Sequence, residues 1–468
     1  MTVVLDGRSL TLDDVVTVAR ESEPVALAPE ASDAMRRARE VAVAALERGD
    51  EAYGLTTGVG VRKHARVEAA GHERLLVQHH LIAQGPTAPR DVVRATALRL
   101  ANALAQGSTM ARPELAELVV TRLNADRLPE LRTLGSVGQG DLAPMADLAR
   151  GLLDGFEPER GEGIVLLNQN AFATAWGALA VVDALHLLDA LDVAGALDLE
   201  AFGAAAASLD PAIGVLRPYP GLRATLARLA ALLEGSGRPN RNLQDPVVFR
   251  SLPQVHGAAR DAFAFVQQQL EIELNAAQTN PVVTPDGRLV SAAAFEILPL
   301  ATALDLARLA LAPVLTSAAE RAVKLLQAPL TGLPEGLGAR SGLAESALSE
   351  LGIAIQAFAA EARLLALPVS LELVSTTQAE GIEDRTTMAP LAARRLAEMV
   401  ELGARVVAVE LLLAAQASDL RGTPLGRGTG EAHALVRSLA PLLGEGAPLP
   451  ELEPLVTLVR SGALGAIR

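Results

Sequence analysis

The sequence predicts an all-α protein, and three observations support that class. Apolar residues recur at helical spacing over long stretches, such as residues 75–123 and 300–318. Strand-like patterns are few and short, at residues 3–5, 163–166 and 281–283. Half of the 468 residues are apolar and only 2% are aromatic, and the small side chains of the helical stretches allow close helix packing.

Turns and capping residues divide the helical pattern into elements. Thr11, followed three residues later by Asp14, is a capping signal for a first helix. A charged loop with Gly and Pro at residues 155–163 precedes a helix expected at about 171–191. The later elements are a loop at 234–240, helices with apolar stripes at 300–318 and 396–407, a loop between them at 329–342, and a loop at 423–430 before a short helical region.

We expect one integrated fold with two regions. Residues 1–195 form the N-terminal region and carry two glycine-punctuated loops, at 53–60 and 138–140. Residues 196–468 form the second region, in which the long helices lie antiparallel in a bundle. Glu410 lies in an apolar helical stripe of this region, so its carboxylate is expected to pair with an arginine across the bundle.

Composition excludes several classes of function. The chain has no cysteine and its start lacks the basic and apolar segments of a signal peptide, so we expect a cytoplasmic protein. The net charge of −14 argues against nucleic acid or membrane as a partner. No metal site is expected, because neighbouring His79 and His80 point in different directions on a helix and no further ligands lie at suitable spacing.

Seven motifs in chain order resemble those of the histidine and phenylalanine ammonia-lyases. They are residues 53–60 (YGLTTGVG), 76–80 (LVQHH), 135–144 (GSVGQGDLAP), 166–168 (LLN), 244–255 (QDPVVFRSLPQV), 273–281 (ELNAAQTNP) and 383–390 (EDRTTMAP). The resemblance implies the mainly helical L-aspartase-like fold. It also implies a homotetramer in which several subunits share each active site.

The resemblance also implies roles for single residues. Tyr53 would take the β-proton of the substrate, while Asn168 and Arg250 would hold the substrate and its carboxylate. On the residues alone, Arg250 is expected to meet a carboxylate, either that of a ligand or a structural one such as Asp245. Further substrate contacts are implied at His80, Phe295 and Glu383.

One motif departs from the family pattern in a way that affects the chemistry. The family carries Ala-Ser-Gly before Asp-Leu-Ala-Pro, and this triplet cyclises and dehydrates to an electrophilic methylidene-imidazolone. Here Gly138, Gln139 and Gly140 stand in a stretch that is one residue short, and Gln139 has no β-leaving group. Ser136 is a poor substitute, because the β-branched Val137 after it crowds the attacking amide. We therefore expect no methylidene-imidazolone and no other cofactor.

Three functions fit this pattern. The first is an enzyme that uses Tyr53 to move a proton in an elimination, addition, isomerisation or cyclisation of a small carboxylate-bearing substrate. In that enzyme, the backbone amides of Gly138–Gly140, just before a helix, would stabilise the anion. The second is a catalytically degenerate homologue that acts as a binding or partner subunit. The third is a conventional histidine or aromatic amino acid ammonia-lyase.

Overall fold

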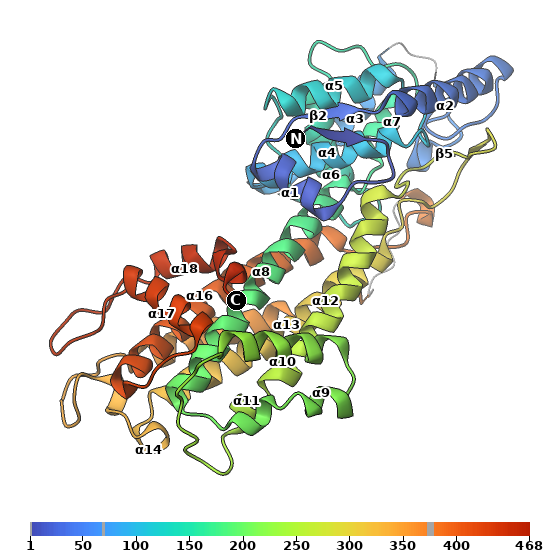
Figure 1. The fold of residues 1–468 in the computed structure, drawn as a ribbon. Helices are drawn as coiled ribbons and strands as arrows, with labels where there is room; N and C mark the ends of the chain where they lie inside the picture. Colours follow the sequence, from blue (N-terminus) through green and yellow to red (C-terminus); the bar gives the residue numbers. More distant parts are fainter. Residues whose placement is uncertain (1, 68–70, 372–378) are drawn as a thin grey trace. The chain divides into compact units, whose positions relative to one another are not determined.

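The structure is a computed structural model that describes residues 2–67, 71–371 and 379–468. Helices make up most of the described residues, and the strands form three separate two-stranded sheets. The all-α class is therefore confirmed. Contacts between Cα atoms divide the chain into two compact units (Figure 1). Unit 1 comprises Met1–Ala180, Val266–Asp305 and Pro368–Arg394; unit 2 comprises Val181–Phe265, Leu306–Leu367 and Arg395–Arg468.

The two units interleave along the sequence. The two regions expected at 1–195 and 196–468 stay a prediction, because the contact units follow a different division. Four long helices contain a boundary between the units, and they include the long helices expected in the second half of the chain. They are α8 (Ala171–Phe202), α12 (Leu252–Asn275), α13 (Leu298–Leu325) and α16 (Ala389–Arg421).

Unit 1 carries the described strands and several shorter helices. The strands are β1 (Val3–Leu5), β2 (Val25–Leu27), β3 (Gln84–Thr87), β4 (Arg132–Leu134), β5 (Val282–Val283) and β6 (Leu289–Val290). The helices are α1 (Leu12–Arg20), α2 (Pro29–Arg48), α3 (His72–His79), α4 (Arg90–Ala105), α5 (Pro113–Asn124), α6 (Leu142–Leu152) and α7 (Glu162–Leu167), with single turns η1 (Gly60–Arg62) and η4 (Ala379–Gly381). Strands β1 and β2 pair in parallel, whereas β3–β4 and β5–β6 are antiparallel.

Local sequence signals account for several of these elements. Thr11 caps α1 through a capping box with Asp14, as expected. The strand expected at residues 3–5 is β1, and the pattern at 281–283 gives the short β5. Gly107 follows the C-cap residue of α4 and Pro113 begins α5, where the apolar pattern is interrupted, whereas Gly85 and Pro86 lie in β3.

The strand expected at residues 163–166 is wrong, because these residues form helix α7 (Glu162–Leu167). A short buried apolar run does not distinguish a strand from a helix. The start of the segment decides the matter here. Gly161 adopts a left-handed conformation with φ 86°, and the carboxylate of Glu162 accepts a hydrogen bond from the Glu159 backbone N–H at 2.8 Å.

Helix α4 is the buried centre of unit 1. Helices α1, α2 and α5 pack against it, and all of its residues from Val92 to Ala105 are buried. Its buried cation Arg99 is held by backbone carbonyls, with Nε 3.0 Å from Glu273 O and Nη2 2.6 Å from Ala276 O. This contact fixes the end of α12 and therefore the segment that follows it.

Unit 2 contains the remaining elements. They are α9 (Ala212–Leu216), α10 (Pro220–Leu232), α11 (Val247–Arg250), α14 (Ala328–Thr331), α15 (Leu351–Leu365), α17 (Arg427–Leu439) and α18 (Glu453–Arg460), with single turns η2 (Ala206–Leu209), η3 (Glu335–Leu337) and η5 (Ala463–Ala466). The arginine that pairs with Glu410 is Arg321, whose Nη2 lies 2.6 Å from Glu410 Oε1. Arg321 also contacts Asp198 at 3.0 Å. The pairing of Glu410 with an arginine is therefore confirmed.

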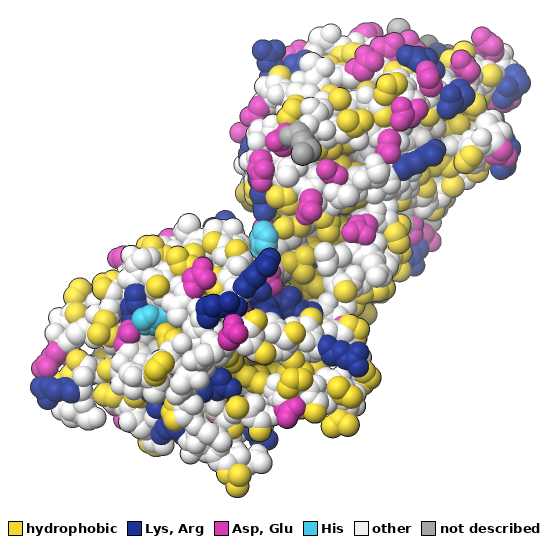
Figure 2. Space-filling model, viewed as in Figure 1, with side chains coloured by type: hydrophobic (Ala, Val, Ile, Leu, Met, Phe, Trp, Pro, Cys, Tyr) yellow, Lys and Arg dark blue, Asp and Glu magenta, His cyan; other side chains and the backbone are white. Residues whose placement is uncertain are grey.

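Within the described part of the chain, two helical stretches are long and apolar enough to span a membrane by length and composition. They are Glu162–Phe202 and α13, and 78% and 56% of their most apolar windows are buried in the structure. The core helices of large proteins pass the same test. On the face drawn in Figure 2, acidic and basic side chains are interspersed with hydrophobic ones.

Candidate active site

Tyr53 lies in a tight loop after α2 that packs against α7. The Gly60 backbone N–H donates to Tyr53 Oη at 2.9 Å. Gly54 has φ 67°, and a Cβ added there would lie 2.8 Å from the side chain of Ile164 in α7. The loop therefore needs glycine at this position to approach α7 so closely.

The surroundings of Tyr53 favour its neutral phenol. Burial raises the pKa of Tyr53 above its ordinary value of 10, the hydrogen bond from Gly60 lowers it, and the charge of Glu383 raises it again. Partial desolvation and the adjacent Asp384 raise the pKa of Glu383. Tyr53 and Glu383 are thus close enough to interact, although 330 positions separate them in the sequence. A positive charge placed beside both groups would lower both pKa values.

The Gly138–Gly140 loop is held by residues just before α16. The Thr387 backbone N–H donates to Val137 O at 3.1 Å, and Thr387 Oγ1 donates to Gly138 O at 2.7 Å. Gly138 has φ 80°, and a Cβ added there would collide with Thr387 Oγ1. The Gly138 N–H donates to Ser136 Oγ at 3.2 Å, so one of the three loop amides already has an acceptor within the loop.

Gln139, at the centre of this loop, is bound to Glu296. Gln139 Nε2 donates to Glu296 Oε2 at 2.7 Å, and the two residues form an isolated antiparallel bridge. Glu296 Oε1 accepts from the Leu298 N–H at 3.0 Å, at the start of α13. Arg385 Nε lies 3.5 Å from Glu296 Oε2. The side chain of Gln139 is thus held by a carboxylate that no sequence motif singled out.

Asp141 connects the loop to the start of α8. Helix α6 begins after Asp141 as expected, but the carboxylate does not cap its own helix. It accepts from the Ala173 N–H at 2.8 Å and from Ser136 Oγ at 3.1 Å. Burial raises the pKa of Asp141 to about 7, against the effect of these hydrogen bonds. The carboxyl is therefore largely neutral in mildly acidic solution.

Three consecutive amide side chains after α7 are buried. Asn170 Nδ2 donates to Phe295 O at 2.6 Å, and Asn168 Nδ2 lies 3.4 Å from Asn280 O. The side-chain oxygens of Asn168, Gln169 and Asn170 accept no hydrogen bond from the described residues. A buried acceptor without a donor is costly, so these oxygens mark a place that is suited to an incoming donor.

The structure brings most of the candidate residues together in unit 1. A Cβ added at Gly140 would lie 2.6 Å from Asn168 Oδ1, so this loop touches the buried amides. The carbonyl of Phe295 belongs to the same cluster, because it accepts a hydrogen bond from Asn170. Glu383 lies four residues before Thr387, which holds Gly138. These contacts join four stretches that are distant in the sequence.

Two candidates lie outside this set of contacts. His80 ends α3, half-buried, with Nδ1 2.7 Å from Leu76 O of its own helix. Arg250 belongs to unit 2, is exposed, and donates from Nε to the backbone O of Asp245 at 2.7 Å. The Asp245 carboxylate is used by the Ala205 N–H and Asn242 instead, so Arg250 has no structural carboxylate partner in its unit. The substrate roles of His80 and Arg250 stay predictions.

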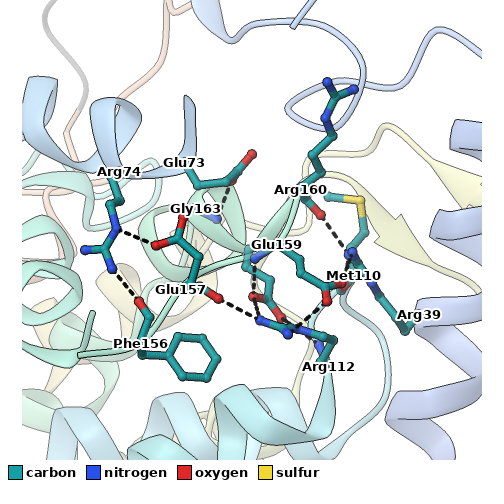
Figure 3. A network of polar contacts seen from close by, with 11 residues as sticks. Arg39, Glu73, Arg74, Met110, Arg112, Phe156, Glu157, Glu159, Arg160 and Gly163 are labelled. Atoms are coloured by element: carbon teal, nitrogen blue, oxygen red, sulfur yellow. Dashed lines mark hydrogen bonds and ion pairs between the residues drawn. The ribbon is translucent and has the colours of Figure 1, made fainter. Parts of the chain in front are cut away.

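Helix α7 is fixed at its N-terminal end by a network of charges (Figure 3). Glu162 is buried and contacts Arg112 through Nε and Nη2 at 2.9 and 2.8 Å. The hydrogen bond to Glu162 is the main cause that raises the pKa of Arg112. Glu73 of α3 adds a hydrogen bond from the Gly163 N–H at 2.7 Å. This network sets the position of a helix whose other end leads into Asn168.

No metal site is evident among residues 2–67, 71–371 and 379–468. These residues hold no group of three or more His, Asp or Glu side chains arranged to bind a metal ion. The sequence analysis did not single out Glu296 or Asn170, and it did not predict that Asp141 would contact the start of α8. Each acts through partners far along the chain, so only Asp141, inside a recognisable motif, left any signal.

Comparison with known proteins supports the resemblance. A sequence model of the family described as "Aromatic amino acid lyase" matches residues 10–158 and 153–438. A histidine ammonia-lyase of Clostridium tetani is 33% identical over 499 residues, covering 99% of this chain and 96% of that protein.

Solved structures with the same fold include an ergothionase and a histidine ammonia-lyase. The ergothioneine-degrading enzyme ergothionase of Treponema denticola has a TM-score of 0.92 and 25% identity, covering 99% of both chains. The histidine ammonia-lyase of Trypanosoma cruzi has a TM-score of 0.90 and 29% identity, covering 99% of this chain and 94% of that one. The expected lyase fold is thus confirmed, and the chain belongs to the aromatic amino acid lyase family.

Proposed function

We propose that the chain eliminates an amine from a small carboxylate-bearing substrate without a methylidene-imidazolone. In this reaction Tyr53 Oη takes the proton from the β-carbon. The C–H electrons form the Cα=Cβ double bond, and the C–N bond breaks with its electron pair leaving on nitrogen. The observation that carries the proposal is Gln139 at the centre of the Gly138–Gly140 loop, where its side chain is bound to Glu296 at 2.7 Å.

The residues of this loop do not fit the family's electrophile. Gln139 offers no hydroxyl that could leave from its β-carbon. Ser136 is the only hydroxyl-bearing residue in the loop, and its Oγ is engaged by the Gly138 N–H and by Asp141. Cyclisation at Ser136 would also require attack by the amide of Val137, next to a β-branched side chain. No step of the proposed reaction therefore passes through such a group.

The substrate must then carry its own leaving group. One similar structure is that of an ergothioneine-degrading enzyme. Ergothioneine is a betaine with a quaternary α-nitrogen and a carboxylate. A quaternary nitrogen has no lone pair with which to attack an electrophile. It departs directly as a neutral tertiary amine. We therefore propose an α-quaternary ammonium carboxylate as the substrate class.

A cationic substrate would also explain how the neutral phenol of Tyr53 becomes a base. Burial and Glu383 raise the pKa of Tyr53, so the free protein holds a phenol rather than a phenolate. A permanent positive charge bound near Tyr53 and Glu383 would favour both anions. The substrate would thus supply the field that makes Tyr53 a base, and Glu383 would hold the ammonium group.

The remaining residues are proposed to bind and orient. The buried amide oxygens near Asn168 face no donor in the described part of the chain and suit a ring N–H of the substrate. Amides of the Gly138–Gly140 loop would stabilise negative charge that develops on the carboxylate. Arg250 would bind the carboxylate from a second subunit, as the family resemblance implies.

A shared active site requires an oligomer, which we also propose. Support comes from large apolar side chains exposed on two helices of unit 2: Leu309 of α13 is 47% exposed, and Ile353 and Leu364 of α15 are 70% and 67% exposed. Contiguous apolar surface often marks an interface, and we infer that these side chains belong to one. Native mass spectrometry should give four chains; a monomer would exclude the role of Arg250.

Intact mass and product analysis test the proposal. The expected mass is that of the unmodified sequence, whereas the electrophile would lower it by two waters. With ergothioneine the expected product is trimethylamine. Tyr53→Phe should abolish its release, while Tyr219→Phe, which changes the only other tyrosine, should keep it. Tight binding without release of amine would instead identify a binding protein.

A conventional histidine ammonia-lyase is the second candidate. It is favoured by the curated relative that is 33% identical and carries that name. Its signature would be ammonia released from histidine, together with the lower mass. An unmodified mass combined with ammonia release would reject both versions, since histidine would then react without either form of activation.

A further inference from the structure

Glu296 joins three parts of the candidate site. Its Oε2 accepts from Gln139 Nε2 at 2.7 Å and lies 3.5 Å from Arg385 Nε. Its Oε1 accepts from the Leu298 N–H at 3.0 Å, which fixes the carboxylate at the start of α13. Glu296 also follows Phe295, whose carbonyl accepts from Asn170.

The contacts of Glu296 complement the other restraints on the loop. Thr387 holds the backbone carbonyls of Val137 and Gly138, the first through its N–H and the second through its hydroxyl. Gln139 is held differently, by its own side chain and by the bridge to Glu296. A charge-assisted hydrogen bond of this kind is stronger than one between neutral groups. Glu296 therefore restrains the residue that stands where the family's reactive triplet would be.

We propose that Glu296 is a positioning residue that sets the Gly138–Gly140 loop through Gln139 and ties it to the Glu383 segment through Arg385. Its catalytic meaning rests on the proposed function, but the restraint itself does not. Gln139 would then replace the missing electrophile by a fixed polar anchor. The backbone amides of Gln139 and Gly140 would keep one orientation toward the substrate.

Exchanging the side chains of Gln139 and Glu296 distinguishes the contact between these two residues from the contact of Glu296 with Arg385. Gln139→Glu sets two carboxylates against each other and should open the loop. Adding Glu296→Gln to it restores a hydrogen bond of reversed direction, because the new amide can donate to the residue 139 carboxylate while its oxygen still accepts from Leu298. The double variant also removes the carboxylate of residue 296 that forms the ion pair with Arg385.

Hydrogen exchange in the absence of any substrate provides the measurement. In Gln139→Glu, amides of residues 136–141 should exchange about tenfold faster, the scale of one lost charge-assisted hydrogen bond. The double variant should return them to the wild-type rate, while amides of residues 382–388, which lose the ion pair with Glu296, should exchange faster than in the wild type. Gln356→Glu is a matched control, because Gln356 donates to Glu320 at 3.1 Å in unit 2 and the change should leave the loop unaltered.

Two results would overturn the positioning role. One is unchanged exchange of the loop in Gln139→Glu, and the other is a double variant that exchanges as fast as the single one. Because this readout needs no turnover, it stays informative even if the proposed elimination fails. If the elimination holds, Gln139→Glu should lower kcat more than it raises KM, and the double variant should recover most of kcat.

Discussion

Glu162 at the start of helix α7 and residues 168–170 after its end are all buried, and they differ in how fully their side-chain oxygens are hydrogen-bonded. At the N-terminal end, the two oxygens of Glu162 accept four hydrogen bonds, three from Arg112 and one from the Glu159 N–H. At the C-terminal end, the side-chain oxygens of Asn168, Gln169 and Asn170 accept none from the described residues.

This difference distinguishes a carboxylate that supports the fold from amide oxygens that are suited to binding a ligand. The fully hydrogen-bonded carboxylate of Glu162 holds the helix in place and has no free acceptor to offer a substrate. The amide oxygens at the other end cost stability until a donor arrives, which is expected of a site that binds a ligand. The contrast leads to four predictions, which run from the largest effect to the smallest.

Removal of Glu162 should have the largest effect. Glu162→Ala leaves Arg112 without its main partner and frees the start of α7, so the free energy of unfolding should fall by about 3–5 kcal/mol. Denaturant unfolding measures this change. Glu157→Ala, which breaks the exposed contact with Arg74, should cost at most about 1 kcal/mol. Equal losses for the two variants would contradict the supporting role.

Asp141 should make stability depend on pH. Its pKa is raised from 3.8 to about 7, so the folded protein binds this proton more tightly than the unfolded chain does. The stabilisation is complete below pH of about 4 and is lost as pH rises to about 7, with an upper limit of roughly 4 kcal/mol. Asp141→Asn should flatten this part of the profile, measured by urea unfolding. An unchanged slope would show that Asp141 is ionised throughout.

Asn168 should matter more for the ligand than for the fold. Asn168→Ala removes an acceptor that lacks a donor, so unfolding should change by less than about 1 kcal/mol, while ligand affinity falls about tenfold. Asn124→Ala is the contrasting control, because Asn124 exchanges hydrogen bonds with Val25 in both directions. A larger stability loss at Asn168 than at Asn124 would reverse the comparison.

Glu383 should have the smallest effect, seen in the titration of Tyr53. The charge of Glu383 raises the pKa of Tyr53, so Glu383→Gln should lower that pKa, by less than about one unit. In a Tyr219→Phe background, Tyr53 is the only tyrosine, and its phenolate absorbance reports the titration directly. A pKa that stays constant or rises would place Glu383 too far from Tyr53 to act on its charge.

Local patterns predicted much of the fold, because they depend on neighbours in the sequence. The capping box of Thr11 and the pairing of Glu410 with an arginine followed from such patterns. The strand expected at residues 163–166 was wrong, since a short apolar run fits either structure. The helix starts after Gly161, and its first residue, Glu162, is also bound by Arg112, which lies 50 positions away. Tertiary contacts of this kind leave no local signal.

The site was predictable where it coincides with a motif. Gly140 lies against Asn168, and the charge of Glu383 acts on Tyr53, all within unit 1; their motifs singled out these residues, and their roles stay predictions. Glu296 was not predictable, because its bond to Gln139 joins residues 157 positions apart and neither residue type is distinctive. Its importance depends on where the fold places it.

The short length of α7 has a consequence for motion. Gly54 presses the Tyr53 loop against Ile164, and Asn168 follows the same helix only four residues later. The Tyr53 loop and Asn168 are therefore both attached to one helix of six residues, less than two turns long. A shift of α7 would therefore move the Tyr53 loop and Asn168 together.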